Sequence, residues 1–157
     1  AGTDPVLSPE MRATGEVMCV DQKVGIAFLK SQQAASSPLP AEGTVVLHGP
    51  NNQEKELHQL ETAYRDIGYE VKLLWENSKK TEYDSVVAHL GKSPQFVVSL
   101  SDSSNNLSQQ LRKITVKRNI PLITTKRAAE LALKGLNDMK GIKQTSVMAM
   151  QEYYSTF

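Results

Sequence analysis

Hydrophobic and polar positions follow two alternating periods along most of this chain. Residues 44–48 form a short β-branched, apolar run, which predicts a strand ended by Gly49 and Pro50. In residues 53–67 the apolar positions recur at helical spacing, which predicts a helix ended by Gly68. One strand followed by one helix is therefore the basic unit.

This unit recurs three more times with short connections. Further strands are predicted at residues 69–75, 95–100 and 120–124, and further helices at residues 81–90, 106–118 and 125–136. The order predicts an α/β fold with a mostly parallel central sheet and helices on both faces. Ligands of such sheets bind outside the carboxyl ends of the strands.

The helices also have predicted inward faces and caps. The inward residues are Leu57, Leu60, Tyr64 and Ile67 in one helix, Tyr83, Val86, Val87 and Leu90 in the next, and Leu107, Leu111 and Ile114 in the third. The predicted caps are Asn51 or Asn52, Thr81 with Asp84, and Thr125.

The two ends of the chain lie outside this repeating region. Residues 21–33 predict a helix, capped by Asp21, with Val24, Ala27 and Phe28 on one face. Residues 34–42 contain two prolines and predict a linker. We therefore divide the chain into residues 1–37, a preceding segment with a connecting helix, and residues 38–157, the α/β domain. In the tail we predict a last strand at 145–150 and a short helix at 151–154.

The composition is that of one globular domain. The chain has 157 residues, of which 39% are hydrophobic and 22% charged, and a net charge of +1. Its basic residues are scattered, which argues against nucleic acid or an anionic membrane as a partner. The single Cys19 excludes an internal disulfide or a cysteine-based zinc site and fits a reducing compartment. No apolar run reaches the roughly 18 residues of a membrane span, and residues 1–5 lack the features of a signal peptide.

Two loops at predicted strand ends are candidate ligand sites. Residues 48–52 precede a helix N-terminus, which can hold an anion, but they carry no nucleotide-binding glycine motif, and a cap and turn is the alternative. Residues 99–106 offer hydroxyls and amides to a phosphate or carboxylate. Asp102 would repel such an anion, and a solvated loop is the alternative.

Neither a metal site nor a catalytic constellation is predicted. His48, His58 and His89 have no metal-ligand spacing and are predicted to be surface or cap residues. No G-x-S-x-G motif occurs, and Asp102 is the only acid at a predicted strand tip.

The first thirty residues carry a family signature. GTDPVLSPEMRATGEVM at residues 2–18 and VGIAFLKSQ at residues 24–32 resemble the end of the second ATP-grasp unit of the carbamoyl-phosphate synthetase large chain. From residue 43 on, GTVVL, IGYEVKLLW, QFVVSLS and IPLITT are collinear with that family's C-terminal regulatory domain. The resemblance implies a methylglyoxal-synthase-like fold, a three-layer α/β sandwich with a mostly parallel central sheet.

The resemblance also implies a regulatory function, with a small anionic effector: a nucleotide, N-acetylglutamate or ornithine. The implied effector-binding residues are Lys55, Trp75, Asn77, Ser99, Ser101, Ser103, Ser104, Asn105, Thr124 and Thr125. The implied relay to the catalytic unit consists of Pro9, Glu10, Met11, Arg12, Thr14, Gly15 and Glu16. The parent enzyme would use ATP with Mg or Mn to make carbamoyl phosphate for arginine, pyrimidine or urea synthesis. This fragment would itself be non-catalytic and hold no cofactor.

Departures from the family pattern leave a second interpretation open. The family's T-x-G-T after the second strand is replaced by Leu74-Trp75-Glu76-Asn77, and the segment that follows is shorter than usual. These changes favour a degenerate domain that acts in oligomerisation or interdomain docking. The expected partners are the rest of the large chain, a glutaminase subunit and a second copy of the chain. The expected location is the cytoplasm, with the mitochondrion as the alternative.

Overall fold

A parallel β-sheet forms the centre of the molecule. The computed structural model describes residues 17–92, 95–101, 106–142, 149, 151, 152 and 155. Within these residues the sheet has four strands, all parallel, in the order β2-β1-β3-β4. The strands are β1 (Thr44–Gly49), β2 (Glu70–Trp75), β3 (Gln95–Ser99) and β4 (Leu122–Ile123). The first strand in the chain is therefore an inner strand of the sheet.

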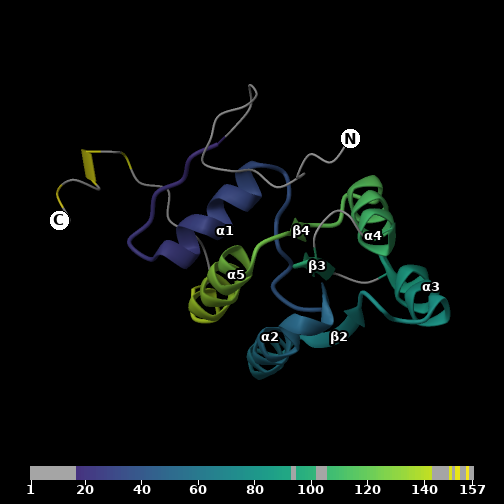
Figure 1. Ribbon diagram of the computed structural model, residues 1–157. Coiled ribbons are helices and arrows are strands. Elements are labelled where there is room, and N and C mark those ends of the chain that lie inside the picture. Colours follow the sequence, from purple (N-terminus) through teal and green to yellow (C-terminus); the bar gives the residue numbers. More distant parts are fainter. Residues whose placement is uncertain are drawn as a thin grey trace.

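Helices cover both faces of this sheet (Figure 1). On one side lie α1 (Val24–Ala34), α2 (Glu54–Asp66) and α5 (Lys126–Met139), and on the other lie α3 (Lys80–His89) and α4 (Asn106–Lys117). A short 3₁₀ helix, η1 (Asn51–Gln53), leads into α2. This arrangement confirms the predicted three-layer α/β sandwich and the predicted order of strands and helices.

The side covered by α1, α2 and α5 has an aromatic core. Three buried rings meet edge to face there, with centroids 5.6–6.0 Å apart. They are Tyr64 of α2, Tyr69 just before β2, and Phe96 of β3. Val45 and Leu47 of β1 point into the same core. The large buried rings hold this side together through apolar burial and edge-to-face contacts.

The side covered by α3 and α4 has a smaller apolar core. Val46 of β1, Leu74 of β2 and Val97 of β3 pack against Tyr83 of α3 and Leu111 of α4. Successive residues of a strand point to opposite faces, so β1 supplies both cores. His48 shares the parity of Val46 and therefore belongs to the α3 and α4 side of the sheet.

α1 lies directly against α5 (Figure 1), and two glycines allow this contact. A Cβ atom on Gly135 would stand 2.3 Å from the carbonyl oxygen of Gly25, and one on Gly25 would stand 2.5 Å from the backbone nitrogen of Gly135. Leu29 of α1 is buried in the aromatic core. The domain boundary at residue 37 stays a prediction, but α1 itself packs on the last helix of the α/β domain.

The predicted inward face of α1 is correct for Phe28, which packs against the aromatic core, and wrong for Val24. Val24 is 53% exposed, whereas Gly25, Ile26 and Leu29 are buried. The reason is the glycine contact with α5, which turns a different side of the helix inward. The inward residues predicted for α2, α3 and α4 are correct, since each one is buried or packs against one of the two cores.

The structure contradicts three of the four predicted caps. α1, α2 and α3 begin after Lys23, Gln53 and Lys79, and none of these helices has a side-chain cap. Asp21 instead accepts the backbone N–H of Lys23 and pairs with Lys30, while Asn51 and Asn52 lie in η1. Thr81 and Asp84 lie inside α3, two residues too late for a capping box.

The other end signals are confirmed. Thr125 accepts the N–H of Ala128 at 3.2 Å and so caps α5. Gly68 and Gly91 follow α2 and α3 with φ angles of +94° and +83°, which favour glycine. Of the strand predicted at 145–150 only residue 149 is described, and of the short helix predicted at 151–154 residues 151 and 152 are described and helical.

Candidate functional site

Two polar side chains lie buried at the carboxyl ends of the inner strands. His48 of β1 is 1% exposed, Ser99 of β3 is fully buried, and the His48 Nδ1 and Ser99 Oγ atoms are 3.0 Å apart. The prediction of a surface or cap histidine is therefore wrong for His48, because β1 is an inner strand whose residues are all buried. His58 and His89 are exposed on helices, as predicted.

Ser101, just beyond β3, forms hydrogen bonds both to α4 and to the loop after β2. Its hydroxyl lies 2.6 Å from that of Ser108 on α4, and its carbonyl oxygen accepts a hydrogen bond of 2.7 Å from Nη2 of Arg112. The same hydroxyl donates to the carboxylate of Glu76, which follows β2 directly. The group His48, Glu76, Ser99, Ser101, Ser108 and Arg112 is called the carboxyl-edge cluster below.

Arg112 is the chemically distinctive member of this cluster. Its Nε atom is buried and makes no hydrogen bond to any described residue. Buried guanidinium N–H groups normally have a partner, and a carboxylate or phosphate matches their geometry best. The site therefore offers a buried donor that a small anion can satisfy.

The surroundings also control the charge of His48. Burial, together with the positive charge of Arg112, lowers the pKa of His48 from 6.5 to about 4. The ring is therefore neutral at neutral pH. Arg112 and Glu76 are then the two groups of the cluster that carry formal charges.

The cluster lies where this type of sheet places its ligands. From β1 the chain continues into α2 on one face, and from β3 it continues into α4 on the other face. The two neighbouring strands thus lead to opposite faces at their carboxyl ends, which is the topological switch point of an open α/β sheet. The Leu100 N–H donates to the His48 carbonyl at 2.8 Å and holds the two strand ends together.

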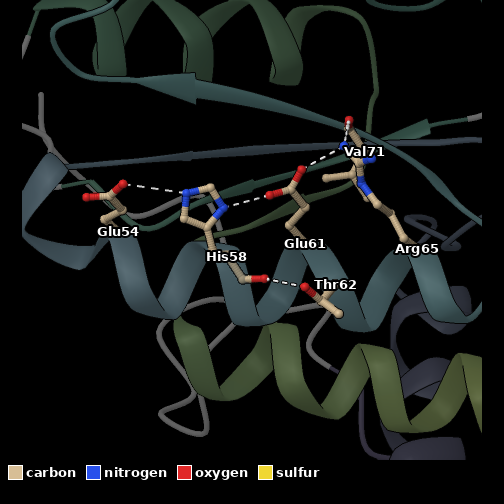
Figure 2. A network of polar contacts seen from close by, with 6 residues as sticks. All are labelled: Glu54, His58, Glu61, Thr62, Arg65 and Val71. Atoms are coloured by element: carbon tan, nitrogen blue, oxygen red, sulfur yellow. Dashed lines mark hydrogen bonds and ion pairs between the residues drawn. The ribbon is translucent and has the colours of Figure 1, made fainter.

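A second polar network runs along the exposed side of α2 (Figure 2). His58 lies between two carboxylates, with Nδ1 2.8 Å from Glu61 and Nε2 3.6 Å from Glu54. Arg65 pairs with Glu61 at 2.6 Å and donates to the carbonyl of Val71 on β2 at 3.4 Å. This network is solvated and lies on α2, across the sheet from α4, so it is not part of the carboxyl-edge cluster.

Three members of the cluster were missed in the sequence. They are Ser108, Arg112 and Glu76. Ser108 and Arg112 recur at helical spacing with Thr115 and form a polar stripe beside the apolar face of α4, a signal that could have identified Arg112. Glu76 stands at the end of β2, so the prediction that Asp102 is the only acid at a strand tip is wrong. Asp102 itself lies outside the described residues.

Neither a metal centre nor a membrane helix is found in the described part of the chain. Its histidine, cysteine and acidic residues form no group of three or more that could hold a metal ion. The helices there are too short or too polar to cross a membrane.

Comparison with known proteins finds relatives along nearly the whole chain. No protein-family model matches it. The chain is 29% identical over 174 residues to the chloroplastic, arginine-specific carbamoyl phosphate synthase large chain of Oryza sativa subsp. japonica, with 99% of this chain and 15% of that protein covered. It is 31% identical to the carbamoyl phosphate synthase large chain of Rhodopirellula baltica, with 99% of this chain and 16% of that protein covered. The chain is a homologue of the carbamoyl phosphate synthase large chain.

One relative corresponds to part of such an enzyme. It is the carbamoyl phosphate synthase large chain, C-terminal section, of Aquifex aeolicus, which is 25% identical over 97% of this chain and 32% of that protein. The chain thus spans 15 to 32% of the length of these three large-chain relatives. Its similarity to a C-terminal section agrees with the expected position in the parent enzyme.

The structure brings together only some of the residues that were expected to bind an effector. Ser99 and Ser101 belong to the carboxyl-edge cluster. Trp75 ends β2, where its ring centroid lies 5.8 Å from that of His58. The remaining predicted residues that are described lie elsewhere: Asn77 is exposed after β2, Lys55 is exposed in the first turn of α2, Thr124 is partly buried after β4, and Thr125 caps α5.

The other predicted residues cannot be placed. Ser103, Ser104 and Asn105 of the expected effector site lie outside the described residues. The same holds for the expected relay residues Pro9, Glu10, Met11, Arg12, Thr14, Gly15 and Glu16. Their roles stay predictions.

Proposed function

We propose that this chain is the regulatory section of a carbamoyl phosphate synthase large chain and binds a small anionic effector at the carboxyl-edge cluster. Its similarity to a C-terminal section of that enzyme supports the first part. The observation that carries the second part is the buried Nε of Arg112, which has no partner among the described residues. Arg112 donates to the Ser101 carbonyl, and the Ser101 hydroxyl lies 2.6 Å from that of Ser108, at the switch point of the sheet.

An effector bound there would act by coupling, because Arg112 belongs to α4 and Ser101 to the loop after β3. A ligand bonded to both would favour one arrangement of this edge over another. The difference in affinity between the two arrangements limits the regulatory effect, typically to about 1–3 kcal/mol. The residues at 9–16 would then pass the change to the catalytic unit.

The chemistry of the whole enzyme would lie outside this chain. The parent would hold ATP with Mg or Mn, take its nitrogen from ammonia or a glutaminase subunit, and make carbamoyl phosphate for arginine, pyrimidine or urea synthesis. We place it in the cytoplasm, with the mitochondrion as the alternative. The fragment alone would have no synthase activity and no cofactor.

Isothermal titration of the chain with UMP, IMP, N-acetyl-L-glutamate and L-ornithine, each to millimolar concentration, tests the effector site. We expect heat with at least one ligand, and at least about tenfold weaker binding after Arg112→Lys, because lysine lacks the planar, forked donor set. Arg127→Lys is the matched control, since Arg127 is 81% exposed on α5 and pairs only loosely with Glu130 at 3.6 Å. No heat with any of the four ligands contradicts effector binding. Unchanged binding by Arg112→Lys contradicts the site.

One observation favours the alternative role in docking. Val17, Met18, Val20 and Val24 expose 37%, 84%, 52% and 53% of their surface within eight residues. Such an apolar segment can pack against the preceding part of a longer chain or against a second copy. Sedimentation analysis over a range of concentrations tests the second copy. A dimer that Met18→Ser dissociates, together with no effector heat, would favour docking over regulation.

A further inference from the structure

The carboxyl-edge cluster holds a carboxylate as well as a guanidinium. Glu76 accepts a hydrogen bond from the Ser101 hydroxyl, and Arg112 donates to the Ser101 carbonyl at 2.7 Å. Both charged groups therefore contact the same residue, Glu76 at its hydroxyl and Arg112 at its carbonyl oxygen. Among the described residues no ion pair joins Glu76 to Arg112. The two charges therefore do not neutralise each other by direct contact.

The other groups of the cluster do not neutralise Glu76. His48 is neutral at neutral pH, since burial and the positive charge of Arg112 lower its pKa to about 4. Ser99, Ser101 and Ser108 contribute hydroxyls only. A ligand that binds Arg112 through an anionic group therefore has a carboxylate close to its other end.

We infer that Glu76 is a specificity-determining residue, which selects ligands that carry a protonated amine beside a carboxylate and disfavours phosphorylated or N-acylated ligands. The inference rests on the proposed effector site. The carboxylate of an amino acid would satisfy Arg112 and its ammonium group would donate to Glu76. A phosphate monoester such as UMP brings only negative charge, and an N-acetyl group removes the ammonium charge that Glu76 would pair with. The selectivity thus follows from one positive and one negative group that both contact Ser101.

Calorimetry with two matched ligands tests the inference. L-Glutamate and N-acetyl-L-glutamate differ only at the amine, and UMP serves as the phosphorylated probe. We expect the chain to bind L-glutamate at least about tenfold more tightly than either of the others. Glu76→Gln should weaken L-glutamate by roughly tenfold and strengthen N-acetyl-L-glutamate and UMP, while its amide oxygen can still accept from Ser101.

Glu70→Gln is the matched control. Glu70 also accepts from a hydroxyl, that of Thr44 at 3.2 Å, but it lies at the amino end of β2, away from the cluster. Its substitution should leave all three affinities unchanged. Tighter binding of UMP or N-acetyl-L-glutamate than of L-glutamate, or an order of affinities that Glu76→Gln leaves unchanged, overturns the role of Glu76 but not the effector site. No binding of any ligand, including the four of the earlier titration, overturns both.

Discussion

The two faces of the sheet differ in what they bury. On the side of α1, α2 and α5 the buried groups are apolar, and the Tyr64 hydroxyl reaches the Ala129 carbonyl at 2.8 Å. On the side of α3 and α4 a smaller apolar core gives way to buried polar groups, including the Arg112 Nε and the Tyr83 hydroxyl, neither of which bonds a described residue. The first side therefore contributes mainly to stability, whereas the second keeps buried polar atoms without a described partner, which lowers stability.

The largest expected effect is in the aromatic core. Phe96→Ala should lower the free energy of unfolding by about 3–5 kcal/mol, because Phe96 is fully buried and touches both Tyr64 and Tyr69. Urea unfolding followed by circular dichroism measures the loss. Val116→Ala, at a half-exposed position on α4, is the control and should change stability by less than about 0.5 kcal/mol. A loss below about 1 kcal/mol for Phe96→Ala would contradict the central place of the aromatic core.

The next effect is a pH dependence that arises on the other face. The folded-state pKa of His48 is lowered from 6.5 to about 4, so the unfolded chain binds more protons between these values. Stability should be complete above about pH 6.5 and fall by about 3 kcal/mol as the pH drops to about 4. Urea unfolding from pH 7 to pH 4 measures the fall.

Two variants assign this pH dependence. His48→Gln should flatten this part of the profile even if it lowers stability at every pH, since glutamine does not titrate. His89→Gln should leave the profile unchanged, since His89 is exposed on α3. Equal profiles for the wild type and His48→Gln would mean that another group causes the fall.

A smaller effect is expected where α1 meets α5. Gly135→Ala should destabilise the chain by about 1–3 kcal/mol, because the new methyl group would meet the backbone of Gly25. This overpacking should outweigh the gain of about 1 kcal/mol that alanine brings to a helix. Gly141→Ala, which meets no atom within 4 Å, is the control for urea unfolding. A stabilised Gly135→Ala variant would show that α1 does not pack against α5.

The smallest effect compares one tyrosine from each face. Tyr64→Phe should cost about 1 kcal/mol, since it removes a buried hydrogen bond to Ala129. Tyr83→Phe should be neutral or stabilising, since its buried hydroxyl is desolvated without a partner, which also raises its pKa. Paired urea titrations give both values. Equal losses of unfolding free energy would mean that the two faces do not differ in how well their buried hydroxyls are hydrogen-bonded.

The sequence predicted the fold well, because the evidence for it is local. Helical and strand periods recur along the chain, and turn glycines such as Gly68 separate them. The order of these elements then limits the sheet to a parallel one. The predicted caps were wrong for α1, α2 and α3. The residue at which a helix begins also depends on contacts around it, such as the Asp21–Lys30 ion pair near α1.

The candidate site was harder to predict, because its members come from four separate segments. Ser99 and Ser101 stood out as hydroxyls at a strand end, but Arg112 looked like one more basic residue of an exposed helix. His48 looked like a surface residue until the strand order placed β1 between two others. The positions of both residues depend on contacts between distant parts of the chain, which a local sequence pattern does not show.

The polar network on α2 also determines what the outer strand can do. Glu70 and Glu76 donate backbone N–H groups to the loop and end of β1, so the alternate residues Val71 and Trp75 point their backbone groups away from the sheet. Arg65 already occupies the Val71 carbonyl (Figure 2), and Ser78 bonds both the N–H and the carbonyl of Trp75. An approaching strand from another molecule would find these positions taken. These contacts leave fewer backbone groups of β2 available for strand addition, the first step of edge-to-edge aggregation.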